Sequence, residues 1–135
     1  GETEKVKLIV AELNKKNMKE GIESTYEIRP WGNFKILLNS KASKVKKLNI
    51  SPRKRLSLQY HNFRSEHWLV IKGTATIYID GKILKLISGM SIDIPVKSQH
   101  YIHNNSDDEL IIIETQLGEY FGEDDIIRLD DPYKR

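Results

Sequence analysis

The residues best suited to chemistry are four histidines that fall in two short windows of the sequence. His61 and His67 lie in the first window, close to Glu66, and His100 and His103 lie in the second. The chain has no cysteine, so a metal site would have to use imidazole, carboxylate or amide ligands. Nitrogen and oxygen ligands of this kind suit Zn²⁺, Mn²⁺, Fe²⁺, Co²⁺ or Ni²⁺.

The spacing of these residues indicates which side chains share a face. Gln59 and His61 are two positions apart in an expected strand, so both side chains should point to the same side. Glu66 follows a turn and returns on the next strand, and His100 lies on a later strand that can pair alongside. Any one of them alone is more often an ordinary polar core residue. As a set, they predict a metal site inside a barrel.

The elements that must position this set are strands. From Phe34 onward the sequence consists of short segments rich in β-branched residues, separated by turn signals such as Asp80-Gly81. Many short strands with no helix between them predict an antiparallel sandwich or barrel. The expected strands are Phe34–Leu38, Val45–Ile50, Leu56–His61, Trp68–Lys72, Thr74–Ile79, Lys82–Ile87, Ser91–Ile94, Gln99–His103 and Glu109–Leu117.

The two ends of the chain differ from this pattern. Glu4–Lys19 reads as an amphipathic helix that would pack on the barrel or on a partner subunit, or connect to an upstream domain. The tail from Gly118 to Arg135 is dense in charge and is expected to lack strands. We therefore divide the chain into residues 1–28, a helix and linker, and residues 29–135, a barrel with a charged C-terminal tail.

Composition sets outer limits on function. The 135 residues, 39% hydrophobic and 30% charged, suffice for one globular domain. The longest apolar run, Leu110–Ile113, is far too short to span a bilayer, so we expect a cytoplasmic protein that does not enter the membrane.

Positive charge is concentrated between Ser40 and Ser65, where there is no acidic residue. Such a stretch either keeps a strand edge soluble or binds an anion. It lacks interleaved aromatic residues and matches no nucleic-acid module, so a phosphorylated small molecule is the better anionic partner. Its basic residues are Lys41, Lys44, Lys46, Lys47, Arg53, Lys54, Arg55 and Arg64.

The first window resembles the first cupin motif, which is His-x-His, three or four residues, Glu, six residues and Gly. Here Gln59 stands in place of the first histidine, and His61, Glu66 and Gly73 fall in register. An amide oxygen is a weaker donor than imidazole, so the substitution weakens the ligand set without abolishing it.

The second window resembles the second cupin motif. Gly89, Pro95, His100 and Asn104 are in register, whereas Lys97 stands where the motif has glycine. The resemblance implies an all-β cupin barrel, a jelly-roll-like double-stranded β-helix, here with an N-terminal α-helix. It also implies one divalent metal ion, with zinc as first choice and Mn, Fe, Co or Ni as alternatives. The implied ligands are Gln59, His61, Glu66 and His100.

Longer strings resemble a particular group of cupins, the type II mannose-6-phosphate isomerase domain. They are Arg29-Pro-Trp-Gly32, Leu56-Ser-Leu-Gln-Tyr-His61, Arg64-Ser-Glu-His-Trp68 and the stretch Gly118–Arg128. This domain is commonly the C-terminal part of a bifunctional enzyme with mannose-1-phosphate guanylyltransferase, which serves GDP-mannose and polysaccharide biosynthesis. The resemblance implies a sugar-phosphate substrate and interconversion of mannose 6-phosphate and fructose 6-phosphate. A homodimer and an upstream guanylyltransferase domain are the expected partners.

The same resemblance suggests roles for residues outside the metal set. Glu119, Asp124 and Asp125 stay open as candidates for the general base, and His67, which should face away from Glu66, could instead be a packing residue. The implied catalytic residues are Arg64, His67, Arg128 and Arg135. The implied substrate-binding residues are Arg64, Lys97 and Glu119.

Two other classes of function remain open. A non-catalytic cupin could bind a sugar or sugar nucleotide and regulate or scaffold an enzyme. A different cupin enzyme, such as a metal-dependent oxygenase or an epimerase, is the other alternative, but the basic Arg64 near the expected site argues against the hydrophobic substrate usual for an oxygenase.

Overall fold

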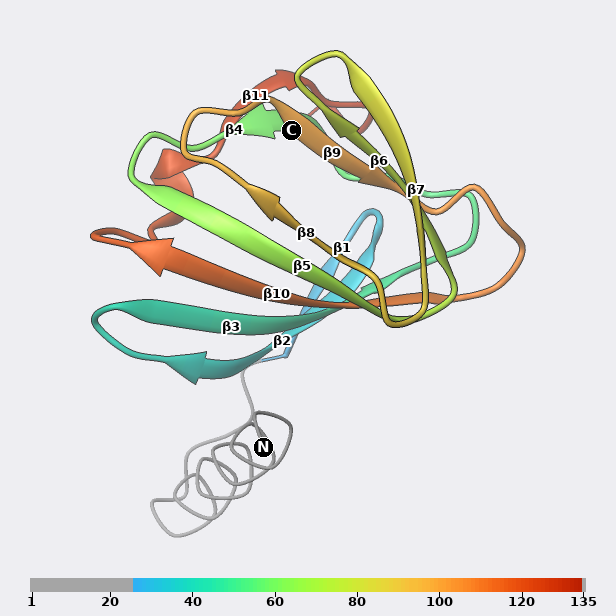
Figure 1. The fold of residues 1–135 in the computed structure, drawn as a ribbon, viewed down its shortest axis with the longest axis horizontal. Helices are drawn as coiled ribbons and strands as arrows, with labels where there is room; N and C mark the ends of the chain where they lie inside the picture. Colours follow the sequence, from blue (N-terminus) through green and yellow to red (C-terminus); the bar gives the residue numbers. More distant parts are fainter. Residues whose placement is uncertain (1–25, 135) are drawn as a thin grey trace, which may run out of the picture.

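The computed structural model describes residues 26–134, which form two antiparallel β-sheets that face each other (Figure 1). The six-stranded sheet has the spatial order β1 (Tyr26–Arg29), β2 (Gly32–Asn39), β3 (Ser43–Ile50), β10 (Leu110–Gly118), β5 (Arg64–Lys72), β8 (Ser91–Ile94). The five-stranded sheet has the order β11 (Ile127–Asp130), β4 (Leu58–Tyr60), β9 (His100–His103), β6 (Thr74–Ile79), β7 (Lys82–Ile87). A short 3₁₀ turn, η1 (Glu123–Asp125), precedes β11.

The core lies between the inner faces of the two sheets. Buried and less buried residues alternate along β5 and β10, so one face of each strand is hidden. Trp68 on β5 and Ile112 on β10 pack there against Ile77 and Ile102 from the other sheet. The same inner face of β10 then continues into polar residues, because Glu114 lies in the alternation that began with Ile112. One end of the core is therefore apolar, and the other end contains buried polar and charged side chains.

The fold confirms the all-β prediction, and each of the nine expected strands is present. The prediction missed β1, and it missed β11, which lies in the tail expected to lack strands and pairs with β4. It also began β5 at Trp68, whereas β5 begins at Arg64. β1 and β11 each have three exposed positions out of four and no buried one, so they lack the buried face that hydrophobic alternation would reveal.

The expected helix Glu4–Lys19 lies outside the described residues. The division of the chain at residue 28 stays a prediction, although β1 (Tyr26–Arg29) runs across that position by pairing with β2. Within residues 26–134, no helix has the length and apolar character needed to cross a membrane.

Gly118 at the end of β10 lets two backbones approach closely. A Cβ atom at this position would lie 2.3 Å from the carbonyl oxygen of Phe63, and the residue has φ +155°. We expect Gly118→Ala to reduce the free energy of unfolding by about 2–4 kcal/mol, because backbone atoms must move to admit the methyl group. Denaturant unfolding measures the change.

Gly81→Ala is the control for this substitution. Gly81 also has positive φ, at 89°, but nothing lies within 4 Å of a Cβ built there. The alanine at position 81 should therefore cost only the backbone strain, about 1 kcal/mol. Equal losses in the two variants would show that the close approach at Gly118 is not a constraint.

Candidate metal centre

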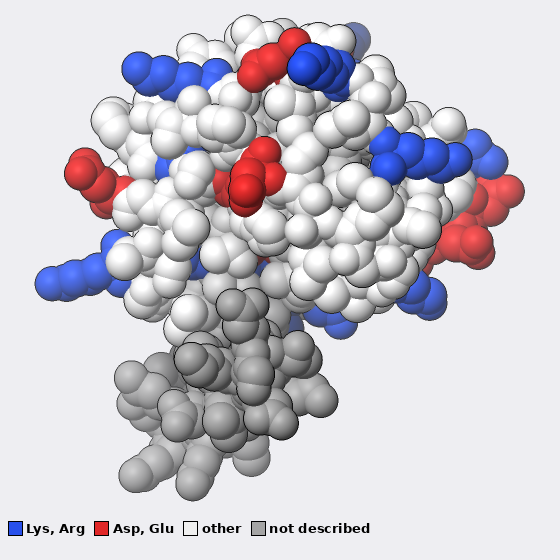
Figure 2. Space-filling model, in the orientation of Figure 1, with Lys and Arg blue, Asp and Glu red and all other residues white. Residues whose placement is uncertain are grey.

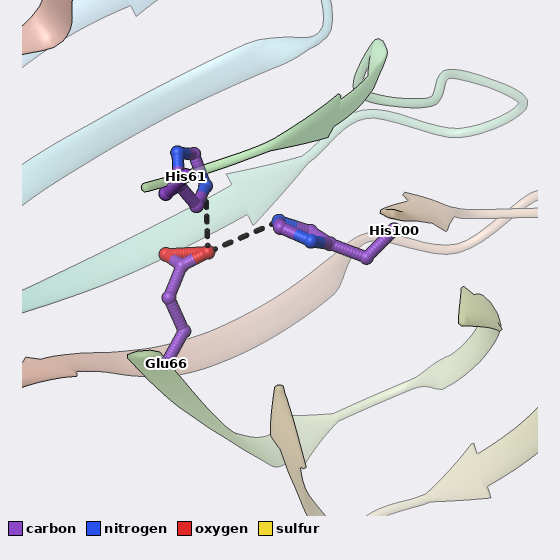
Figure 3. A group of neighbouring side chains, drawn as sticks. All are labelled: His61, Glu66 and His100. Atoms are coloured by element: carbon purple, nitrogen blue, oxygen red, sulfur yellow. Dashed lines mark hydrogen bonds and ion pairs between the residues drawn. The ribbon is translucent and has the colours of Figure 1, made fainter. Parts of the chain in front are cut away.

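Three buried side chains from three different segments converge between the sheets (Figure 3). His61 directly follows β4, Glu66 lies on β5 and His100 begins β9. The Nε2 atoms of both histidines lie 3.1 Å from the same carboxylate oxygen, Oε1 of Glu66. One ligand atom from each residue lies within 4.8 Å of the other two, which is compact enough for a single ion. The structure thus brings these three predicted residues together, and their role as metal ligands stays a prediction.

Hydrogen bonds at Nδ1 of each imidazole fix the orientation and tautomer of the two rings. His61 Nδ1 lies 3.0 Å from the carbonyl oxygen of Asp125, and His100 Nδ1 lies 2.8 Å from that of Ser98. A carbonyl can only accept, so both Nδ1 atoms carry the proton, and in a neutral ring Nε2 presents its lone pair to Glu66. Two lone pairs facing one carboxylate oxygen are repelled by it unless a proton or a metal ion lies between them. The donor set therefore fits a divalent metal ion, and the backbone carbonyls orient its ligands.

Gln59 lies next to this group by strand register. It pairs directly with His100 across β4 and β9 and is buried, with 8% of its surface exposed. Its Oε1 accepts a hydrogen bond of 3.0 Å from Ser57 Oγ. An amide oxygen in this position can serve as a fourth donor, and that role stays a prediction.

The electrostatics of the group favour separated charges in the metal-free chain. Burial acts against ionisation of Glu66, but hydrogen bonds from His100 and His61 outweigh it and hold its pKa well below the usual value. Burial likewise opposes protonation of His100, yet the hydrogen bond and the charge of Glu66 raise its pKa. A divalent ion would take the place of the proton on His100, so protons and metal compete for this site.

Asp125 positions the segment that carries His61. It is buried, and its two carboxylate oxygens accept hydrogen bonds from the backbone N–H groups of Asn62 at 2.9 Å and Phe63 at 3.0 Å. Its own carbonyl oxygen orients the His61 ring, as described above. Both carboxylate oxygens are thus engaged in hydrogen bonds to the backbone. This favours a positioning role over the general-base role that the sequence left open.

We expect Asp125→Asn to lower the free energy of unfolding by about 1–2 kcal/mol, because an amide has one acceptor oxygen for two backbone donors. Affinity for a divalent metal should also fall, since the segment that follows His61 is held less firmly against the Asp125 carbonyl that orients its ring. Thermal unfolding and metal titration measure the two effects. Asp124→Asn is the control, because Asp124 is exposed and accepts its hydrogen bond from the Tyr120 hydroxyl. A metal affinity that drops equally in both variants would contradict this role.

A cavity adjoins the metal group. Gln59 and Arg64 belong to its wall and also neighbour the metal ligands. Arg64 is 3% exposed; its Nη2 lies 3.8 Å from Glu66 Oε2 and 3.4 Å from His61 Nε2. The lining residues are Arg29, Trp31, Phe34, Lys46, Leu48, Leu56, Gln59, Arg64, Glu114, Glu123, Ile126 and Arg128. The cavity thus lies next to the candidate metal ligands and is lined by several cationic side chains.

Glu114 is a buried carboxyl in the wall of this cavity. Trp68 Nε1 donates to its Oε1 at 3.3 Å, and Gln116 Nε2 donates to its Oε2 at 2.8 Å. Burial, followed by the negative charge of Glu66, raises the pKa of Glu114 to about 7, against the opposing charges of Lys46 and Arg64. It can therefore hold or release a proton near neutral pH.

The other residues predicted from the sequence occupy different surroundings. Arg64 is the first residue of β5 and is buried. His67 points to the other face of β5, with its side chain 41% exposed and paired with Asp93 at 2.6 Å. Lys97 and Glu119 are exposed and do not line the cavity, and Arg128 lies on β11 and does.

The catalytic role of His67 and the substrate-binding roles of Lys97 and Glu119 stay predictions. Arg135 lies outside the described residues, so its predicted role also stays open. Lys97 has φ +69°, a left-handed conformation that suits the glycine of the cupin motif at this position.

Among the charged cavity residues, Glu114 was not picked out from the sequence, Arg29 and Glu123 were included only in family strings, and Lys46 only as one of the basic residues between Ser40 and Ser65. The signal for two of them was present. Glu114 continues the inward alternation of β10, and Lys46 shares parity with the buried Leu48 on β3. A charge that falls on the core face of a strand is costly unless it is used, and that criterion would have selected both residues.

The sheet topology and the metal group together define a cupin. The chain is similar to an RmlC-like cupin from Shewanella frigidimarina, with a TM-score of 0.64 and 20% identity, covering 77% of this chain and 90% of that one. It is also similar to the capsular polysaccharide assembling protein CapF from Staphylococcus aureus, with a TM-score of 0.67 and 22% identity, covering 80% of this chain and 34% of that one. At these identities the likeness shows the fold.

Sequence comparison identifies the family. The family model described as mannose-6-phosphate isomerase C-terminal matches residues 14–131, so the chain belongs to this family. It is 40% identical over 130 residues to the alginate biosynthesis protein AlgA of Pseudomonas aeruginosa. It is 37% identical over 130 residues to a mannose-1-phosphate guanylyltransferase of Salmonella montevideo. These matches cover 96% of this chain but only 27% and 28% of the two relatives.

Proposed function

We propose that this chain is a metal-dependent isomerase domain that interconverts mannose 6-phosphate and fructose 6-phosphate. The observation that carries the proposal is the buried His61, Glu66 and His100 group, which adjoins a cation-lined cavity in a member of this family. A metal site beside positive charge suits a substrate that has both an oxygen-rich reacting centre and a phosphate.

The reaction transfers a proton from C2 of the aldose to C1 of the ketose through an enediolate. A divalent ion held by His61, Glu66 and His100, with Gln59 as a fourth donor, supplies Lewis-acid stabilisation of negative charge on oxygen. Zinc is the first choice for this nitrogen and oxygen donor set, with Mn, Fe, Co or Ni as alternatives.

The chain's own side chains have distinct tasks in this proposal. Arg64 is buried beside the metal ligands, where its guanidinium can donate to an oxygen that gains negative charge. Two carboxyl groups line the cavity, Glu114 and Glu123, and of these only Glu114 is buried. Glu114 is therefore the group we assign to proton exchange with the sugar. Arg128, at the cavity wall on β11, is assigned to contacts with substrate oxygens.

The relatives suggest a larger setting. The chain spans just over a quarter of the length of the two relatives described above. We propose that the isomerase acts together with an upstream guanylyltransferase domain, in the supply of mannose-based precursors for polysaccharide biosynthesis. A homodimer remains part of this proposal.

A coupled assay for fructose 6-phosphate formation from mannose 6-phosphate tests the function. Activity should disappear when the chain is treated with a chelator and return when one divalent ion is added back. A folded, metal-loaded chain that binds mannose 6-phosphate without turning it over would contradict the proposal and identify a sugar-binding cupin instead.

A further inference from the structure

Lys46 is a lysine on the core face of a strand. It lies in the middle of β3 with 8% of its surface exposed, in the same alternation as the buried Leu48 and Ile50, whereas the neighbouring Lys47 is exposed. Its side chain lines the cavity beside the metal group. Burying an ammonium group is costly unless it is paired, so its surroundings should reveal what it binds.

The described residues provide only partial compensation for this charge. Lys46 forms no ion pair with a carboxylate within residues 26–134, and its Nζ instead lies 4.3 Å from the centre of the Phe34 ring. The acid directly opposite in the strand register is Glu114, on β10. Glu114 is shared among Trp68, Gln116 and the field of Glu66, so it does not neutralise Lys46 alone.

Further cations surround the same space. The Arg29 guanidinium carbon lies 5.0 Å from the centre of the Phe34 ring, the same ring that Lys46 Nζ contacts. Because both cations contact one ring, their head groups lie in the same part of the cavity. Arg64 lines the same cavity, and its buried Nε has no hydrogen-bond partner. Burial, followed by the charges of Lys46 and Arg64, also lowers the pKa of Lys44, which indicates positive potential at this end of the barrel.

The charges that line the cavity leave an excess of positive charge. Its cations are Arg29, Lys46, Arg64 and Arg128, and its acids are Glu114 and Glu123. The cations of the lining outnumber its acids, although Glu27 and Glu123 pair with Arg29 and Glu66 lies 3.8 Å from Arg64. A site of this kind suits a phosphate monoester, which carries about −1.5 to −2 at neutral pH. Arginine and lysine together offer both bidentate and point-charge contacts to such a group.

We propose that Lys46, with Arg29 and Arg64, forms the binding site for the phosphate group of the substrate. This inference rests on the proposed function for its sugar-phosphate ligand, and it assigns a residue, Lys46, that determines specificity for the phosphorylated over the free sugar. Because Arg64 lies both in this cavity and beside the metal ligands, a ligand with its phosphate at one end can present its other end to the metal.

Equilibrium binding to the metal-loaded chain tests this site. Titration calorimetry with mannose 6-phosphate, with unphosphorylated mannose and with inorganic phosphate should be compared in the unsubstituted chain and in Lys46→Met. We expect Lys46→Met to weaken binding of mannose 6-phosphate and of phosphate about 10- to 100-fold, which is the usual effect of losing one charged contact. Affinity for mannose should change by less than about threefold. In turnover, KM should rise while kcat stays within a small factor.

Lys47→Met is the matched control, because it removes the same charge from the adjacent, exposed position of β3 and should leave all three affinities unchanged. Lys46→Gln serves as a second variant, and thermal unfolding of each variant verifies that it is folded. Equal binding of mannose 6-phosphate by folded Lys46→Met and the unsubstituted chain would overturn the inference, as would a failure of the unsubstituted chain to bind either phosphate ligand. Phosphate-dependent binding without turnover would refute the isomerase and leave the phosphate site in place.

Discussion

Replacing His100 with alanine is expected to abolish the proposed isomerase activity, with a decrease in kcat/KM of about 1000-fold or more. His100 supplies one of three converging ligand atoms, and its ring is fixed by Ser98 on one side and faces Glu66 on the other. Losing it removes a strong donor and the Lewis-acid chemistry that depends on the metal. Steady-state kinetics and metal content should be measured on the same preparation.

His103→Ala is the matched control for this substitution. His103 lies three positions further along β9, is only half buried and lies near Arg55 and Arg53, which lower its pKa after the effect of burial. It should keep its metal and its activity. If His100→Ala retained both a full complement of metal and normal turnover, the assignment of the ligands would be wrong.

The second large effect concerns Glu114 and pH in the metal-free chain. The folded chain raises the pKa of this carboxyl from 4.5 to about 7, so between these pH values the folded state holds a proton that the unfolded state has released. Stability conferred by this group is thus complete below about pH 4.5 and is lost as pH rises to about 7. The total loss is on the order of 3 kcal/mol, at about 1.4 kcal/mol per pKa unit.

Glu114→Gln should remove this dependence. The difference in unfolding free energy between the variant and the unsubstituted chain should shift in favour of the variant by on the order of 2–3 kcal/mol as pH rises from 5 to 8. Denaturant unfolding without metal measures it. Glu109→Gln, at an exposed position just before β10, should leave the dependence on pH unchanged. Parallel curves for Glu114→Gln and the unsubstituted chain would show that Glu114 is ionised in the folded state at low pH.

The strands that could be predicted from sequence are those marked by local signals. β6 and β7 were predicted with their observed ends, because their β-branched and apolar residues and the Asp80-Gly81 turn between them are local signals, although only Leu86 of β7 is buried. β1 and β11 could not be predicted, because each depends on pairing with a partner strand rather than on its own pattern. Figure 1 shows how such short strands lie at the edges of the two sheets.

The metal group could be predicted because its spacing follows from strand periodicity and from two motifs. The cavity could not, because Arg29, Lys46 and Glu114 come from strands that are distant in sequence and meet only through the sheet order. The basic stretch between residues 40 and 65 could not be assigned from sequence for the same reason. The structure shows some of its residues at the surface and others at the cavity, so it combines the two alternatives, a soluble strand edge and an anion-binding site. Lys46 and Arg64 are buried at the cavity, whereas Arg53 and Arg55 form surface ion pairs with Asp107 and Asp130.

The charges on the face shown in Figure 2 and those inside the cavity favour a small-molecule ligand over an extended polyanion. On the face shown in Figure 2, basic side chains stand apart around the edge of the domain and do not merge into one continuous patch. A nucleic-acid surface would present such a patch or stripe. The interior placement of Lys46 and Arg64 instead suits a compact anion that enters the cavity.

The most direct test of the central claim is the stoichiometry of divalent metal binding, measured by titrating the metal-free chain with Co²⁺ and recording its visible absorption. One equivalent should saturate the unsubstituted chain, and Glu66→Gln should weaken binding by at least about 100-fold, since it removes the only anionic ligand of the group. Absence of a saturable band in the folded chain, or equal binding by Glu66→Gln, would contradict a metal centre on His61, Glu66 and His100.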